Sequence, residues 1–299
     1  MPQIKKKKKP SSRPKPPKTK VTVKRKATAQ KAKKSSPSSG VALLQIATFS
    51  PEVNVYPTPS LLFEETAPRV MKIARETADM RGRFVLALSG GSTPKGLFQQ
   101  LSEEPYLSLM PWARTYVFWA DERHVPVTHE TSNYRMAQEY LLSKVPIPKA
   151  NVFPMTDGIL PVDRSASLYE SKLKRFFNTQ EGFPRFDLIL LGLGEDGHTA
   201  GLFPGVQQLN ERKRWVVGYR VDDLRKERIS LTFPVLNLAR TLMVLLEGPR
   251  KAEITKAVLE GPSEPPRYPI QYLQPVGGSL LFLMDETAAA LLHHPSSGD

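Results

Sequence analysis

The stretch FDLILLGLGEDGHTA, residues 186–200, decides the fold: a short apolar run passes directly into a glycine-rich polar turn. RFVLALSGGSTP, residues 83–94, repeats the arrangement. Strands that are apolar throughout are typical of parallel sheets buried on both faces. Stretches with helical spacing of apolar residues separate these runs, which indicates βα units. We therefore expect an α/β fold with a mostly parallel, Rossmann-like sheet and helices on both faces.

The same patterns predict the other elements of the chain. Strands are expected at Val53–Tyr56, Arg83–Leu88, Tyr116–Trp119, Asp187–Leu191, Trp215–Val221, Arg228–Thr232, Leu242–Leu246 and Leu280–Met284. Helices are expected at Leu61–Met80, Pro94–Leu101, Ser132–Leu142, Val162–Phe177, Lys251–Leu259 and Glu286–Leu292. Ligands of such sheets bind beyond the carboxyl ends of strands, so the polar turns after strands are where chemistry is expected.

The charge is divided unevenly along the 299 residues. Residues 1–39 hold 15 Lys and Arg and no acidic residue, whereas residues 40–299 hold the other 28 of the 43 Lys and Arg against all 29 Asp and Glu. The first segment, rich in Lys, Pro and Ser, lacks the bulky apolar side chains that offset ordering entropy. We expect a disordered tail over 1–39 and a single catalytic α/β domain over 40–299.

Several classes of protein are excluded or disfavoured by composition. The chain has no cysteine, which excludes disulfide scaffolds, thiolate metal sites and cysteine nucleophiles. No run of about 18 apolar residues predicts a membrane span, and no apolar segment follows the Lys run as in a secretory signal. A cytoplasmic protein is expected. The balanced charge of residues 40–299 disfavours nucleic-acid binding there, while the tail is either a solubilising segment, a nuclear-targeting signal or a weak polyanion binder.

The first polar turn is Ser89-Gly90-Gly91-Ser92-Thr93. Its glycines allow close backbone approach, and free N–H groups at the start of the following helix suit a phosphate. The Ser92 and Thr93 hydroxyls add donors. A plain Gly/Ser turn with a helix cap remains the alternative.

The second turn is Asp121-Glu122-Arg123-His124. Arg123 can bind a phosphate or carboxylate through two parallel hydrogen bonds. The alternative is a solvated charged loop. His124 and His129 have no recognised metal-ligand spacing, so no metal is expected.

The third turn contains Gly192, Gly194 and Gly197 in a G-x-G-x-x-G pattern, with Asp196 and His198 beside them. Dinucleotide binding requires a helix directly after the glycines, but Pro204 and Gly205 follow soon. A histidine can act as a general base without a metal, and a nearby carboxylate can hold its tautomer. A histidine satisfied by backbone in a tight turn is the alternative. Together the three turns suggest a site for a phosphorylated small molecule with His198 as the base.

Four ordered motifs carry a resemblance to a known family. LALSGGSTP (86–94), WADERHVP (119–126), SNYRMA (132–137) and GLGEDGHTAGLFPG (192–205) resemble the 6-phosphogluconolactonases, and RISLTFPVLNLA (228–239) and FLMDETAA (282–289) continue the likeness. The resemblance covers roughly residues 50–292. One departure is Gly201, where the family pattern more often has Ser.

This resemblance implies hydrolysis of 6-phospho-D-glucono-1,5-lactone to 6-phospho-D-gluconate in the pentose phosphate pathway, without metal or cofactor. It implies a fold like that of glucosamine-6-phosphate deaminase and ribose-5-phosphate isomerase. The implied catalytic residues are His198, Asp196 and Arg123. Phosphate would bind to Ser89, Gly90, Gly91, Ser92 and Thr93, to Lys251 at the matching family position, and to Arg228.

The competing interpretation is an isomerase or deaminase acting on glucosamine 6-phosphate. Its motif usually continues with a glutamate five residues after the histidine, and that glutamate assists ring opening. This chain has Phe203 at that place. The missing carboxylate favours the lactonase.

Overall fold

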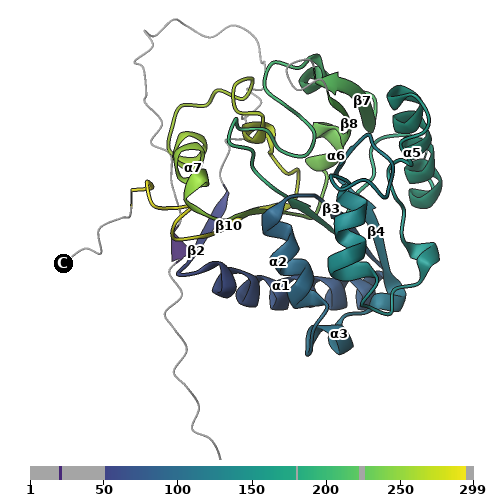
Figure 1. Cartoon of the computed structure of the whole chain (residues 1–299), viewed down its shortest axis with the longest axis horizontal. Helices are drawn as coiled ribbons and strands as arrows, with labels where there is room; N and C mark the ends of the chain where they lie inside the picture. The colour runs from purple at the N-terminus through teal and green to yellow at the C-terminus, as the bar shows by residue number, and fades with distance from the viewer. Residues whose placement is uncertain (1–19, 22–50, 180, 222–225, 294–299) are drawn as a thin grey trace, which may run out of the picture.

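A computed structural model describes residues 20–21, 51–179, 181–221 and 226–293 (Figure 1). The predicted disordered tail lies outside these residues, except for the two-residue strand β1 (Lys20–Val21). The tail therefore stays a prediction. None of the helices in the described ranges is long and apolar enough to cross a membrane.

A seven-stranded sheet forms the centre of the molecule. Its strand order is β1-β2-β10-β9-β6-β3-β4, and every neighbouring pair is parallel except β1 with β2. The strands after β1 are β2 (Glu52–Tyr56), β3 (Phe84–Leu88), β4 (Thr115–Trp119), β6 (Leu188–Leu191), β9 (Thr241–Leu246) and β10 (Ser279–Asp285). The predicted mostly parallel α/β fold is confirmed.

Seven α-helices are described, and most match the predicted ranges closely. They are α1 (Pro59–Arg81), α2 (Ser92–Leu101), α3 (Tyr106–Leu109), α4 (Asn133–Ala137), α5 (Val162–Phe177), α6 (Phe233–Leu236) and α7 (Ala252–Leu259). A π-helical turn (Gln138–Leu142) continues α4, and 3₁₀ turns cover Trp112–Arg114, Lys149–Asn151, Gln207–Asn210, Pro249–Lys251 and Pro269–Tyr272.

Helix α1 shows why such a segment starts and stops where it does. The hydroxyl of Thr58 accepts a hydrogen bond from the amide of Leu61, and Pro59 occupies the first turn. Gly82 ends the helix in the left-handed conformation that glycine adopts without strain. In Figure 1, α1 runs along the lower side of the sheet, while α5 lies beside β7 and β8.

A second, three-stranded antiparallel sheet corrects the prediction in two places. It consists of β5 (Asp121–Arg123), β8 (Lys226–Leu231) and β7 (Val216–Val221). The polar turn expected at Asp121–Arg123 is a strand, and the last two of these strands do not join the large sheet. The connection between β7 and β8 is too short for the crossover that a parallel pair needs, so these two strands pair antiparallel with each other.

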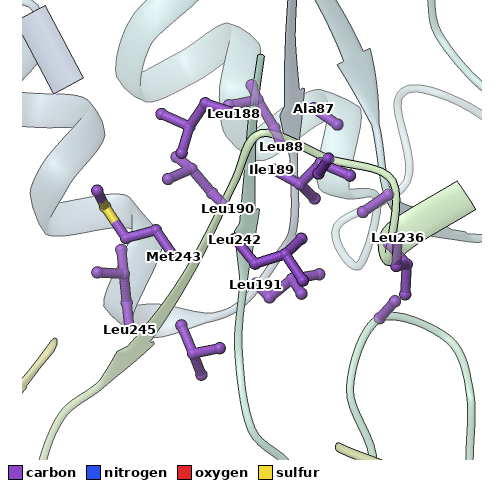
Figure 2. Close-up of a cluster of buried hydrophobic side chains, with 14 of the residues drawn as sticks. Ala87, Leu88, Leu188, Ile189, Leu190, Leu191, Leu236, Leu242, Met243 and Leu245 are labelled. Carbon is purple, nitrogen blue, oxygen red and sulfur yellow. The ribbon is translucent and has the colours of Figure 1, made fainter. Parts of the chain in front are cut away.

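The core lies between the strands of the large sheet and the helices that cover it. All four residues of β6 are fully buried, and their side chains gather with those of β9 in the cluster shown in Figure 2. Each fully buried Leu or Ile contributes about 1.5–3 kcal/mol relative to an exposed one. Apolar packing therefore stabilises the middle of the sheet, in addition to the backbone hydrogen bonds between its strands.

The prediction of a helix at Glu286–Leu292 is wrong. The amides of Ala288 and Leu292 donate to carbonyls three residues back, so the segment forms successive turns. The carboxylate of Asp285 accepts the amides of Ala288 and Gly248, at 3.2 and 2.9 Å. Through Asp285, these bonds connect the segment to Gly248 in the turn after β9. The segment follows β10 as turns and not as a regular helix.

Four adjacent strands bring their carboxyl ends to one edge of the sheet. These are β9, β6, β3 and β4, which lie side by side in parallel. Parallel strands end on the same side, so the polar turns after them converge there.

Candidate active site

A cavity of about 180 Å³ opens at this edge. Its lining comes from all four strand ends and from β5 of the small sheet. The lining residues are Ser89, Gly90, Gly91, Ser92, Thr93, Pro94, Asp121, Arg123, Gly192, Leu193, Gly194, His198, Ala200, Leu245 and Lys251. Of the predicted site residues, only Asp196 and Arg228 do not line it directly.

Asp196 does not line the cavity itself but contacts His198, which does. Its Oδ1 lies 2.5 Å from Nδ1 of His198, and the backbone amide of His198 donates to the same oxygen at 3.1 Å. Burial alone would raise the pKa of the Asp196 carboxyl, but the hydrogen bonds and charge of His198 outweigh burial and lower it. An ionised carboxylate thus accepts from Nδ1, and Nε2 has no partner among the described residues. This leaves Nε2 free to take a proton.

The glycine pattern around His198 serves this contact. A Cβ on Gly194 would lie 2.0 Å from Nδ1 of His198 and 2.5 Å from Oδ1 of Asp196. Gly194 is therefore needed so that backbone can approach the pair. No helix opens after Gly197, as a dinucleotide loop requires; Thr199 and Leu202 form an antiparallel bridge instead.

The first turn places the start of α2 at the cavity. Gly91 precedes the helix at φ +113°, and no side chain caps it. The first amides of a helix have no acceptor within it, so they point free toward the cavity with the positive end of the helix dipole. Ser89 differs from its neighbours: its buried hydroxyl donates to the carbonyl of Leu190 at 2.8 Å. Ser89 thereby fastens the turn to β6.

Lys251, in the 3₁₀ turn that follows β9, lines the same cavity. Its Nζ donates to the carbonyl of Leu193 at 2.8 Å. Burial lowers its pKa, although the nearby Glu195 opposes this. Two of its three ammonium donors are left for a ligand.

Arg123 and Arg228 lie directly opposite each other on β5 and β8. Arg123 lines the cavity and donates through Nη1 to the carbonyl of Thr131 at 2.7 Å. Arg228 lines a neighbouring groove that Arg123 also borders. Burial, and next the charge of Arg123, lower the pKa of Arg228. Two cations held this close attract an anion between them.

Asp121 lines the cavity, Asn133 contacts Asp121, and both were missed as individual site residues. Asp121 is 8% exposed, and burial raises the pKa of its carboxyl against the opposing charges of Arg123, Arg228 and His198. Asn133 donates through Nδ2 to the carbonyl of Asp121 at 2.9 Å, and its buried Oδ1 has no hydrogen-bond partner among the described residues. The motifs contained both residues, but only the fold shows that they meet.

Gly90 fits this arrangement. A Cβ there would lie 1.8 Å from Oδ1 of Asn133. The phosphate-type turn and the Asn133 side chain can approach only because residue 90 is glycine.

Glu122 is buried beside Asp121 and holds the start of α4. It accepts the amides of Arg123, Asn133 and Tyr134 at 2.7–2.8 Å. Desolvation outweighs these bonds and raises its pKa to about 7. Glu122 positions the residues on either side of it rather than facing the cavity.

No group of three or more His, Asp or Glu side chains in the described ranges is placed to hold a metal ion. His124 pairs with Glu227 at 2.8 Å and His129 with the hydroxyl of Thr131 at 2.9 Å. The two histidines thus have separate partners.

The family model for glucosamine-6-phosphate isomerases/6-phosphogluconolactonase matches residues 57–282. A 6-phosphogluconolactonase of Synechocystis is 38% identical over 240 residues, which cover 80% of this chain and 97% of the relative. A chloroplastic 6-phosphogluconolactonase 3 of Arabidopsis thaliana is 43% identical over 64% of this chain and 63% of its own length.

Solved structures agree with these matches. The structure of 6-phosphogluconolactonase from Trypanosoma brucei superimposes with a TM-score of 0.73 at 29% identity, and covers 81% of this chain and 99% of that one. A monomeric glucosamine-6-phosphate deaminase shares the fold with a TM-score of 0.66 at 20% identity, over 80% of this chain and 99% of its own.

Proposed function

Because this chain belongs to the family of glucosamine-6-phosphate isomerases and 6-phosphogluconolactonases, we propose that it hydrolyses 6-phospho-D-glucono-1,5-lactone to 6-phospho-D-gluconate, with His198 as general base. The observation that carries the assignment of the base is the Asp196–His198 pair: His198 lines the cavity, Nδ1 is bound to Asp196, and Nε2 has no hydrogen-bond partner among the described residues. This is the second reaction of the oxidative pentose phosphate pathway.

In the proposed mechanism, Nε2 of His198 takes a proton from a water molecule as its oxygen attacks C1 of the lactone. A positioned general base contributes about 10²–10⁴ in rate. Asp196 holds the imidazole in the tautomer with Nδ1–H and stabilises the imidazolium. The tetrahedral intermediate then collapses: the bond between C1 and the ring oxygen breaks, and His198 returns its proton to the departing C5 oxygen.

Arg123 is the proposed donor to the oxyanion. The amides of Gly194 and Gly197 already donate within the loop, to the carbonyls of His198 and Gly194, at 2.8 and 3.0 Å. Arg123 uses one nitrogen for Thr131 and keeps further donors for the cavity. Charged donors aimed at a developing oxyanion are a large source of rate acceleration.

We assign the 6-phosphate to the start of α2 and to Lys251. Free amides, the Ser92 and Thr93 side chains and the ammonium group meet there, which suits a phosphate dianion. Arg228 assists from the neighbouring groove. Asp121 is the proposed acceptor for a sugar hydroxyl, because its buried carboxylate borders the same cavity.

The deaminase alternative is less well supported. At the position where deaminases carry the ring-opening glutamate, Phe203 stacks on His198 with ring centroids 4.2 Å apart. An aromatic ring cannot transfer the proton that ring opening needs.

The test is hydrolysis of lactone generated in situ by glucose-6-phosphate dehydrogenase, with 6-phosphogluconate dehydrogenase reporting the product. We expect chelator-treated protein to accelerate hydrolysis, and His198→Ala to lower kcat about 10²–10⁴-fold. His293→Ala is the matched control, because that exposed histidine pairs with Glu260 and neither residue lines the cavity. Failure of the folded wild type to exceed the spontaneous rate would reject the function, and full activity of His198→Ala would reject the base.

We further propose a cytoplasmic location and weak, salt-sensitive binding of polyanions by residues 1–39. The 15 basic residues of that segment, with no acid among them, support the second proposal. Some plant relatives are chloroplastic by name, so imaging of a full-length fluorescent fusion is the test of compartment.

A further inference from the structure

Phe203 touches the proposed base through the face of its ring. The Phe203 and His198 rings lie 25° from parallel with centroids 4.2 Å apart, and Phe203 is only 8% exposed. No step of the proposed mechanism uses this side chain.

The conformation of residues 199–203 brings the Phe203 ring back against His198. The amide of Leu202 donates to the carbonyl of Thr199 at 3.0 Å, and Ala200 adopts φ +49°, a conformation uncommon for a residue with a side chain. The next residue, Gly201, is held on both sides: its amide donates to Ser230 Oγ at 3.1 Å, and its carbonyl accepts the hydroxyl of Tyr219. These partners lie on β8 and β7, so the small sheet fixes where Phe203 lies.

The imidazole needs more than the carboxylate to be held in place. The hydrogen bond that Nδ1 donates to Asp196 restrains one ring atom, and coupled rotation about the Cα–Cβ and Cβ–Cγ bonds of His198 can still tilt the imidazole. Gly194 lies against the ring edge, as the 2.0 Å approach of its added Cβ shows. Phe203 supplies the remaining restraint, because a stacked ring sets the plane. A fixed plane holds Nε2 in one direction beside the cavity that His198 lines.

The Arg228 guanidinium lies over the same Phe203 ring, 5.8 Å from its centroid. Phe203 therefore contacts the base and a buried cation at once. It joins the catalytic loop to β8.

We propose that Phe203 is a positioning residue for the reaction: it fixes the imidazole plane of His198 so that Nε2 meets the attacking water. This inference rests on the proposed function of His198. Misplacement of a catalytic group by about 1 Å can cost on the order of 10² in rate. Phe203→Leu, which keeps most of the volume but no planar face, is expected to lower kcat at least about 10-fold and leave KM within about twofold. Phe203→Tyr keeps the face and is expected to retain kcat within about threefold.

The matched control is Phe233→Leu. Phe233 is also buried, at 4% exposure, and its ring packs at a tilt against Tyr272 rather than against His198. We expect Phe233→Leu to lower the melting temperature at least as much as Phe203→Leu and to leave kcat unchanged. Equal losses of kcat in both variants would overturn the proposal, since a general loss of packing would then explain them.

A double-mutant cycle separates positioning from structure. In the His198→Ala background, Phe203→Leu is expected to have no further effect on kcat, because its action passes through His198. An undiminished effect there would overturn the proposal.

A readout independent of activity distinguishes failure of this proposal from failure of the proposed function. In NMR spectra, we expect contacts between the His198 and Phe203 ring protons in wild type, with one sharp set of His198 signals. Phe203→Leu, or Phe203→Met should the leucine variant not fold, is expected to broaden or multiply these signals. One unchanged sharp set would overturn the positioning role even in a protein that hydrolyses the lactone.

Discussion

The two sheets of the molecule differ in where they carry charged residues. In the large sheet, β3 and β6 are buried along their whole length and carry no charge. In the small sheet, β5 consists of Asp121, Glu122 and Arg123, and β8 begins with Lys226, Glu227 and Arg228. One sheet is a scaffold, and the other presents ionisable groups beside the cavity.

The pairing within the small sheet does not favour stability. Arg123 faces Arg228 across β5 and β8, and like charges directly opposite each other destabilise a sheet. Asp121 offsets part of this repulsion. The comparison teaches that stability is concentrated in the large sheet and ligand chemistry in the small one, and it predicts different consequences of substitution in each.

The largest expected effect is a loss of stability in the large sheet. Leu188 is fully buried at the start of β6, the end of the strand farthest from the cavity. Leu188→Ala removes apolar contacts and leaves a cavity, which costs about 2–5 kcal/mol. Urea unfolding should show this loss, while kcat and KM of the folded protein at low temperature remain those of wild type.

Leu168→Ala on α5 is the control, because Leu168 is 40% exposed. We expect its unfolding free energy to change by less than about 1 kcal/mol. A fall in kcat for Leu188→Ala comparable to its loss of stability would show that the two regions are not separable.

The sequence located the strands of the large sheet after β1 and also β7 and β8 of the small sheet, but it missed β5 and the separate pairing of the small sheet, for a physical reason. Apolar runs report burial on both faces, so β3, β6 and β9 could be located from composition and length alone. β5 has no apolar residue and is a strand only because β8 pairs with it. Pairing between residues about 105 positions apart leaves no local signal, so Asp121–Arg123 was expected to be a turn.

The site was predictable where polar residues follow a strand directly in the sequence. The turn at Ser89–Thr93 and the His198 loop both line the cavity. The individual contributions of Asp121 and Asn133 depend on their approach to Gly90 and to each other in three dimensions. The stacking of Phe203 likewise depends on a positive φ at Ala200, and an alanine does not indicate that conformation in the sequence.

The second prediction concerns Arg123 in the small sheet. Arg123→Gln removes the proposed oxyanion donor, and we expect kcat to fall about 10²–10³-fold. Its hydrogen bond to Thr131 is a single surface contact, so the free energy of unfolding should change by no more than about 1.5 kcal/mol. Steady-state kinetics and urea unfolding measure the two quantities on the same preparation.

Arg220→Gln is the matched control, because Arg220 is an exposed cation on β7 of the same sheet. Its kinetics should stay close to wild type. A rise in KM at constant kcat for Arg123→Gln would show that Arg123 binds the substrate in the ground state and does not stabilise the oxyanion. A loss of stability without a kinetic change would contradict the division of roles between the two sheets.

The smallest expected effect is a pH-dependent one at Glu122. Burial raises the pKa of Glu122 to about 7, from 4.5 in the unfolded chain. Between these values the folded protein retains a proton that the unfolded chain has lost, so stability falls as pH rises from about 4.5 through 7. Wild type should lose on the order of 1–3 kcal/mol to this group over that range.

Glu122→Gln tests the cause, since an amide does not ionise. The amide cannot accept all the backbone N–H groups that Glu122 binds, so the variant starts less stable at low pH. Because it lacks the titration, its stability should fall less steeply with pH than that of wild type, and the two unfolding free energies should converge toward pH 8. Glu139→Gln, at an exposed carboxylate beyond α4, should keep the wild-type slope. Parallel curves for wild type and Glu122→Gln would mean that the proton responsible for the pH dependence is not held at Glu122.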